Sequence, residues 1–119
     1  MQAICSFLEN LPKIAVIAKG RSGHEAVALA HEWIPDLVLM DVKMPDVTGL
    51  EAAAQLTREL PDVVVILMSA FEDEGIRKAS QESGALAFVM KEHLTRDLPL
   101  LLELAASRKG WNEPTKNCA

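Results

Sequence analysis

The sequence contains few cysteines and no long hydrophobic run. Cys5 and Cys118 are the only two cysteines among 119 residues, and one near each end of the chain makes no disulfide framework. The longest apolar runs, such as residues 63–68, have the length of a strand and are too short to cross a bilayer. The first residues lack the basic region and the cleavage site of a secretory signal. We therefore expect a protein of the reducing cytoplasm that does not associate with membranes.

Positive charge is also scarce. The chain carries 12 Lys and Arg against 17 Asp and Glu, which gives a net charge of -5, and its basic residues are scattered. Binding to the phosphates of a nucleic acid requires a clustered basic face. The sequence also contains no helix-turn-helix pattern. Direct nucleic-acid binding by this chain is therefore not expected.

Half of the residues are hydrophobic, enough for one compact domain with its own core. Short apolar runs alternate with longer segments of helical periodicity. The expected strands cover residues 14–18, 37–40, 63–68 and 86–90. The expected helices cover residues 22–33, 50–60, 72–83 and a last segment that Asp97 caps and Leu98 begins. An additional helix near the N-terminus is indicated by Ile4, Phe7, Leu8 and Leu11, which fall on one face before Pro12 ends it.

Strands that alternate with helices predict a parallel sheet covered on both faces, an α/β fold. In such sheets ligands and chemistry gather at the carboxyl ends of the strands. Three polar residues directly follow apolar runs there, namely Asp41, Ser69 and Lys91. A carboxylate can accept a phosphoryl group, an ammonium can neutralise it and a hydroxyl can donate a hydrogen bond to it. The alternative from the residues alone is that all three simply face water at strand ends.

Three segments resemble response regulator receiver domains of two-component signal transduction. Residues 35–50, Pro-Asp-Leu-Val-Leu-Met-Asp-Val-Lys-Met-Pro-Asp-Val-Thr-Gly-Leu, are similar to the phosphoacceptor segment, with Asp41, the Met44-Pro45 pair and Gly49 at the matching positions. Residues 66–70 resemble the family's strand that ends in Ser or Thr followed by Ala. Residues 84–91 resemble its last strand, with an aromatic residue three positions before the lysine. The match runs in register over most of the chain.

The resemblance implies a flavodoxin-like doubly wound sheet and a role for each matching residue. Asp41 would be phosphorylated by a histidine kinase or a phosphotransfer protein, with Lys91 as countercharge and Ser69 as the hydroxyl that follows the phosphoryl group. Phe88 would be the switch aromatic, although an ordinary core aromatic fits that position as well. Mg²⁺ would be bound by Asp41 and by the backbone carbonyl of Lys43. The chain would be a non-enzymatic phosphoprotein carrying a 4-aspartylphosphate, with an output domain or a homodimer as its possible effector.

The chain departs from the family at its start. In register, Met1 already lies within the first helix, so the first strand and the acidic pair that holds Mg²⁺ are absent, and neither Glu9 nor Asp46 replaces them. We therefore expect a truncated receiver domain over residues 1–109, a tail over residues 110–119 and an incomplete Mg²⁺ site. The missing strand would lie between residues 14–18 and 37–41. We favour a natural start further upstream; the alternatives are that the two strands pair directly or that a second copy supplies the pairing.

Two other functions compete with the phosphorylated receiver. A pseudo-receiver would use the same fold as a protein-interaction module without phosphate, and the absent acidic pair favours it. An Asp-nucleophile phosphohydrolase needs a second acid two residues after the nucleophile, where this chain has Lys43. Glu92 also follows Lys91 at a position where many receivers have a cis proline, which leaves the geometry of that bond open.

Overall fold

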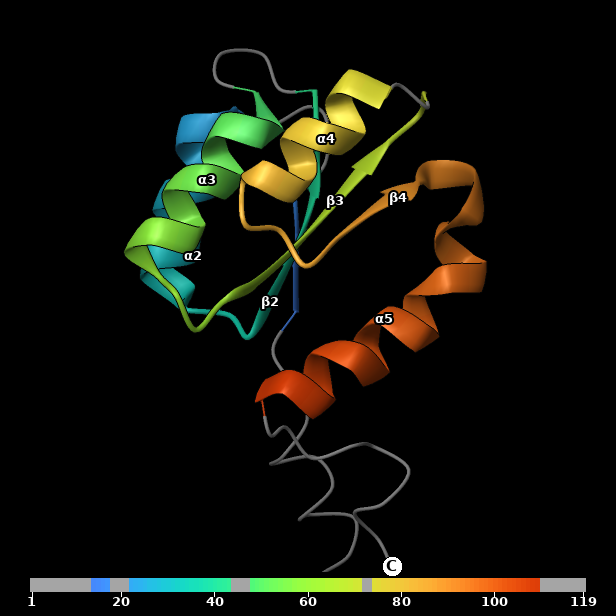
Figure 1. The fold of residues 1–119 in the computed structure, drawn as a ribbon. Coiled ribbons are helices and arrows are strands. Elements are labelled where there is room, and N and C mark those ends of the chain that lie inside the picture. The colour runs from blue at the N-terminus through green and yellow to red at the C-terminus, as the bar shows by residue number, and fades with distance from the viewer. Residues whose placement is uncertain (1–13, 18–21, 44–47, 72–73, 110–119) are drawn as a thin grey trace, which may run out of the picture.

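The computed structural model describes residues 14–17, 22–43, 48–71 and 74–109, which form a four-stranded sheet with helices on both faces (Figure 1). The described strands are β1 (Ile14–Ile17), β2 (Leu37–Asp41), β3 (Val64–Ser69) and β4 (Ala87–Met90). The described helices are α2 (Gly23–Trp33), α3 (Gly49–Glu59), α4 (Glu74–Glu82), the short 3₁₀ helix η1 (Lys91–His93) and α5 (Leu94–Lys109). None of these helices is long and apolar enough to cross a membrane.

All strands of the sheet are parallel and lie in the order β1-β2-β3-β4. Ile14 pairs with Leu37 and Ile17 with Met40, so β1 lies directly beside β2. Of the three arrangements considered for the missing central strand, the described residues adopt direct pairing. Direct pairing satisfies backbone groups that would otherwise be left without partners inside the sheet. The predicted doubly wound α/β class is confirmed.

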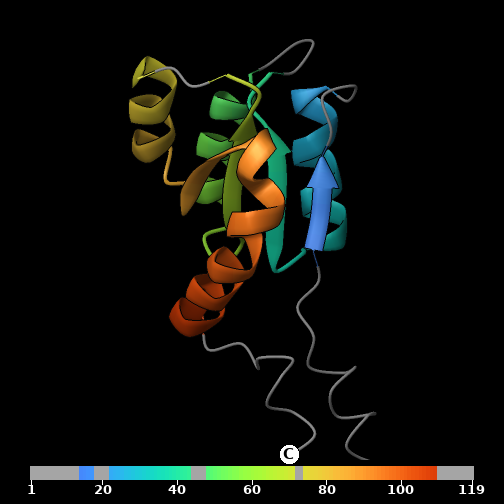
Figure 2. The same ribbon diagram turned by 90° about the vertical axis from the view of Figure 1, so that its right-hand side faces the viewer.

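The helices divide between the two faces of the sheet. Helices α2, α3 and α4 lie on one face and α5 lies on the other (Figures 1 and 2). Side chains alternate along β2 and β3, so Val38 and Met40 enter the α2–α4 core while Leu37 and Leu39 enter the α5 core. Both strands are buried along their whole length, as expected for a parallel sheet covered twice. Each large aliphatic side chain buried in these cores contributes about 1.5–3 kcal/mol to stability.

The exposed strand β1 differs from β2 and β3. Ile14 is 44% exposed and Val16 57% exposed, although their partners Leu37 and Leu39 are buried under α5. Helix α5 therefore covers β2 to β4 and leaves this side of β1 open among the described residues. The predicted helix near the N-terminus, Cys5 and Cys118 lie outside the described residues.

Local sequence signals account for most helix boundaries. The Ser22 hydroxyl accepts a hydrogen bond from the Glu25 amide (2.9 Å), and the Thr48 hydroxyl accepts one from the Glu51 amide (3.2 Å). These caps satisfy amides that have no partner within the first turn of α2 and α3. Helix α2 is followed by its C-cap Ile34, a non-glycine residue in the left-handed region with φ 46°.

The predicted start of the last helix is wrong. Helix α5 begins at Leu94, so Asp97 lies in its first turn and does not cap it. The Asp97 carboxylate instead pairs with the Arg96 guanidinium (2.9 Å). Pro99 is the sixth residue of the helix, where it cannot donate the backbone hydrogen bond to the Thr95 carbonyl and its ring crowds that carbonyl. The sequence predicted Pro99 in the first turn of this helix, whereas the helix begins at Leu94, directly after η1.

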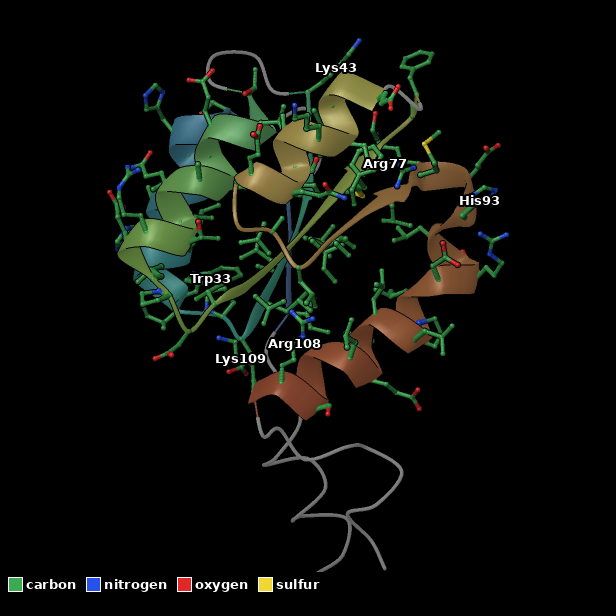
Figure 3. The ribbon with its side chains drawn as sticks, viewed as in Figure 1. Trp33, Lys43, Arg77, His93, Arg108 and Lys109 are labelled. Atoms are coloured by element: carbon green, nitrogen blue, oxygen red, sulfur yellow. The ribbon has the colours of Figure 1, made fainter. Side chains whose placement is uncertain are left out.

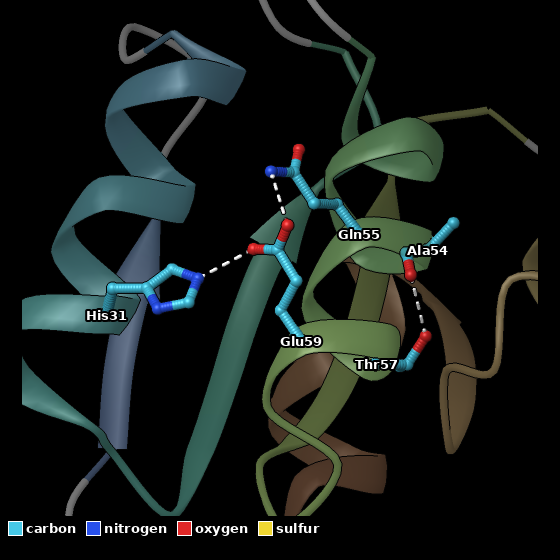
Figure 4. A network of polar contacts seen from close by, with 5 residues as sticks. All are labelled: His31, Ala54, Gln55, Thr57 and Glu59. Atoms are coloured by element: carbon cyan, nitrogen blue, oxygen red, sulfur yellow. Dashed lines mark hydrogen bonds and ion pairs between the residues drawn. The ribbon is translucent and has the colours of Figure 1, made fainter.

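An ion pair joins α2 to α3 on the surface (Figure 4). His31 Nε2 lies 2.7 Å from Glu59 Oε1, and the Gln55 amide donates to Glu59 Oε2 at 3.1 Å. These contacts lower the pKa of Glu59 below its ordinary value of 4.5, chiefly through the hydrogen bond with His31 and then through that with Gln55. Because both side chains remain in contact with water, solvent screens the pair and it contributes little to stability.

Replacing Glu59 by Gln should therefore make the stability of the domain less dependent on pH. Since folding lowers the pKa of Glu59, its carboxylate stabilises the fold above pH 4.5, and this contribution is lost as the pH falls through the folded-state pKa. Urea denaturation should show Glu59→Gln slightly less stable than the parent near neutral pH and equal to it well below pH 4.5. The matched control is Glu103→Gln on exposed α5. A difference that persists unchanged at acidic pH would contradict this account.

Candidate functional site

Asp41 is the last residue of β2 and lies at the carboxyl end of the sheet. It is 2% exposed, so its carboxylate is almost completely removed from water. Its Oδ1 accepts a hydrogen bond from the Lys43 amide at 2.9 Å. Its Oδ2 accepts no directed hydrogen bond from the described residues but contacts the ammonium of Lys91. The carboxylate is thus held by one amide and one positive charge.

Lys91 reaches Asp41 across the intervening strand. Asp41 pairs with Met68 in β3, and Ser69 pairs with Met90 in β4, so the three strand ends are neighbours. Lys91 follows β4 directly, and its side chain is 37% exposed. The structure therefore brings together the predicted carboxylate and the predicted ammonium. The described part of the chain has no cis peptide bond, so the bond before Glu92 is trans.

Ser69 lies at the same end of the sheet, but its hydroxyl is directed elsewhere. The side chain is buried, and its Oγ donates to the Phe71 carbonyl (3.0 Å) and accepts from the Phe71 amide (3.1 Å). The hydroxyl thus closes a turn in the loop that follows β3. Sequence position placed Ser69 next to Asp41 correctly, whereas the direction of its hydroxyl could not be predicted.

Gly49 fixes the backbone behind Asp41. Its amide donates to the Val42 carbonyl at 2.6 Å, where α3 begins. A Cβ at this position would lie 2.1 Å from the carbonyl oxygen of Asp41 and 2.8 Å from the Cα of Val42. Only a residue without a side chain allows this close approach. The close approach to the Asp41 backbone therefore explains sterically why a glycine occupies this position of the motif.

Two cation–aromatic contacts involve the strands and loops that carry Asp41, Ser69 and Lys91, and the sequence did not predict them. The Arg77 guanidinium of α4 lies 5.1 Å from the ring centroid of Phe88, and Lys43 Nζ lies 5.2 Å from that of Phe71. Phe88 is half-buried and packs against the core beneath α2 to α4. These partners are far apart in the chain, so no spacing pattern could have indicated them. Lys43 and Arg77 mark this end of the molecule in Figure 3.

The donors at the site do not fit a Mg²⁺ ion. Among the described residues no group of three or more His, Cys, Asp or Glu side chains could hold a metal. Asp41 and the carbonyl of Lys43 remain from the predicted set, and the carboxylate already faces Lys91. Asp46 lies outside the described residues. Mg²⁺ can complete its octahedron with waters, but the only carboxylate that the described residues offer it is already paired with the Lys91 ammonium.

A parallel α/β sheet with a buried aspartate and a lysine in contact at its carboxyl end defines a receiver-type domain, and comparisons with known proteins agree. The family model for the response regulator receiver domain matches residues 1–103. Response regulator protein VraR of Staphylococcus aureus is 38% identical over 96 residues, which cover 80% of this chain and 46% of the relative. The chain thus spans about half the length of the curated relatives it matches.

Solved structures show the same likeness. A response regulator receiver domain protein from Clostridium thermocellum matches with a TM-score of 0.76 and 22% identity over 84% of this chain and 98% of its own. The signal receiver domain of NarL from Mycobacterium tuberculosis matches with a TM-score of 0.64 and 31% identity over 73% of this chain and 71% of its own. The chain belongs to the response regulator receiver domain family and is a receiver domain of a two-component response regulator. Such domains are generally non-enzymatic signalling modules that bind Mg²⁺ and interact with histidine kinases.

Proposed function

We propose that this domain accepts a phosphoryl group on Asp41 from a histidine kinase or a phosphotransfer protein in the cytoplasm. The observation that carries the proposal is the buried Asp41 carboxylate in contact with the Lys91 ammonium at the carboxyl end of the sheet. A carboxylate in this position is a nucleophile with a cation already beside it to balance the charge that arrives with the phosphoryl group.

The transfer requires one bond to form and one to break. An Asp41 oxygen attacks phosphorus, an O–P bond forms, and the donor's P–N bond breaks so that its electron pair stays on the imidazole of the donor. The product is an acyl phosphate whose phosphoryl oxygens carry roughly 1.5–2 negative charges beside Lys91, in place of the single charge of the carboxylate. Because the Lys91 side chain is only partly exposed and already contacts Asp41, its ammonium is in place to balance this charge.

Ser69 and Phe88 transmit the change in this proposal. The Ser69 hydroxyl would give up its hydrogen bond to the Phe71 carbonyl and donate to a phosphoryl oxygen instead, since a charged acceptor forms a stronger hydrogen bond than a backbone carbonyl. The loop at Phe71 would then move, and Phe88 would repack beneath α4. This is a shift between two packings that the phosphoryl group biases.

Replacing Asp41 by Asn tests the proposal. Incubation of the parent chain with acetyl phosphate and Mg²⁺ should increase the intact mass by one phosphoryl group, slowly because the described donors are a poor Mg²⁺ set. Asp41→Asn should show no increase, and the exposed control Asp62→Asn should behave as the parent. An adduct that survives in Asp41→Asn would refute the assignment of the acceptor.

The second candidate function is a protein-interaction module that works without phosphate. Two observations favour it: the described residues provide no metal cluster, and the Ser69 hydroxyl is engaged by its own loop. A parent chain that acquires no phosphoryl group, even with a purified histidine kinase as donor, would decide for this candidate. In either case we propose that an output segment of the longer protein, or a second copy, receives the signal.

A further inference from the structure

A cavity lies at the end of the sheet opposite Asp41. Its volume is about 390 Å³, within the range of about 300–1,000 Å³ typical of small-molecule sites. It is bounded by the end of α3, by the amino ends of β3 and β4 and by the last turn of α5. None of the residues proposed above for phosphoryl transfer lines it.

The cavity is lined by apolar side chains together with polar backbone and charged atoms. The strand β3 and the chain before it contribute Val63, Val64 and Val65, and Leu86 and Ala105 add two more apolar side chains. Thr57 also lines the cavity, but its hydroxyl already donates a hydrogen bond to the Ser83 carbonyl at 2.8 Å. An occupant therefore meets both apolar and polar surface.

The rim is positively charged. Arg108 and Lys109, at the C-terminal end of α5, both line the cavity, and among the described residues no carboxylate does so. Figure 3 shows both side chains at this lower end of the sheet. Lys109 Nζ donates to the Pro61 carbonyl at 3.2 Å, which anchors α5 over the opening. Arg108 makes no hydrogen bond or ion pair within the part of the chain that the structure describes.

We propose that this cavity binds a small amphipathic carboxylate, an aliphatic or aromatic acid, with its acid group on Arg108. A guanidinium always carries its charge and presents paired donors that match the two oxygens of a carboxylate. A rim that carries two cations and, among the described residues, no carboxylate favours an anion over a cation or a neutral molecule. The apolar side chains in the lining favour a ligand with a hydrocarbon body over a free inorganic anion.

Octanoate is the probe for a titration of the ¹⁵N-labelled chain followed by amide chemical shifts. Saturable shifts should gather on residues 57, 63–65, 84–86 and 105–109, and octylammonium should cause none. Arg108→Gln should weaken octanoate binding about tenfold, as expected for the loss of a charge-assisted pair. Arg96→Gln, exposed near the other end of α5, should bind as the parent.

The same titration can overturn the proposal. Equal binding of octylammonium, unchanged affinity in Arg108→Gln, or shifts confined to the exposed Ile14 and Val16 would each refute it. A shift of the Trp111 indole resonance upon probe binding would indicate that the probe displaces this side chain from the cavity. That result would assign the space to the chain's own tail and refute a ligand site. Ala85→Leu, which fills the cavity from the α4–β4 connection, should abolish binding while the circular dichroism of the fold is retained.

Discussion

Replacing Lys91 by Met is expected to destabilise the domain by about 2 kcal/mol. Met has a similar length but no charge, so the buried Asp41 carboxylate loses the cation that contacts it. Removal of one partner from a fully buried pair costs roughly 3–5 kcal/mol. We expect less because the side chain of Lys91 is 37% exposed, which weakens the pair through solvent screening. Urea denaturation at neutral pH measures the difference.

The reverse substitution should behave differently. Asp41→Asn removes the buried charge and leaves Lys91 free to extend into water, so we expect a loss below about 1 kcal/mol. In the Asp41→Asn background, Lys91→Met should then cost little. A double-mutant cycle that finds the same cost for Lys91→Met in both backgrounds would show that the two side chains are not coupled.

Replacing Gly49 by Ala should destabilise the domain by roughly 3 kcal/mol, at the upper end of the effects of overpacking. The new Cβ would lie 2.1 Å from the Asp41 carbonyl oxygen, and this neighbour is backbone, which cannot rotate away. Either α3 or the end of β2 must shift, and both hold the Asp41 backbone in place. The variant should therefore also lose phosphorylation of Asp41 by acetyl phosphate.

Gly75 provides the control for this substitution. It is exposed in the first turn of α4, where Ala should change the free energy of unfolding by less than about 1 kcal/mol. A Gly49→Ala variant as stable as Gly75→Ala would contradict the steric account. It would also remove the structural reason for the glycine in the segment that resembles receiver domains.

Much of the fold could be predicted because apolar periodicity and caps act locally. The strands and the helices α2 and α3 lie within two residues of their predicted bounds, since Ser22, Thr48 and Pro61 carry clear boundary signals. The start of α5 was missed because η1 connects β4 to the helix, and a 3₁₀ turn has no periodicity of its own in the sequence. Direct pairing of β1 with β2 was one of three arrangements left open, because strand order depends on contacts between distant segments.

The location of the candidate site could be predicted from the sequence, whereas the side-chain contacts within it could not. Parallel strands of one sheet end at the same edge, so Asp41 and Lys91, which each follow an apolar run, were expected at the same end of the sheet. The turn between Ser69 and Phe71 depends on a rotatable hydroxyl, and the contact of Arg77 with Phe88 depends on how α4 packs. Such features arise from tertiary structure and leave no pattern in the sequence.

The most direct measurement identifies the residue that carries the phosphoryl group. After phosphorylation, borohydride reduces an acyl phosphate to an alcohol, and tandem mass spectrometry locates the reduced side chain. The account predicts reduction at Asp41 alone. Reduction at another carboxylate, such as Asp36 or Asp62, with Asp41 unmodified would contradict it.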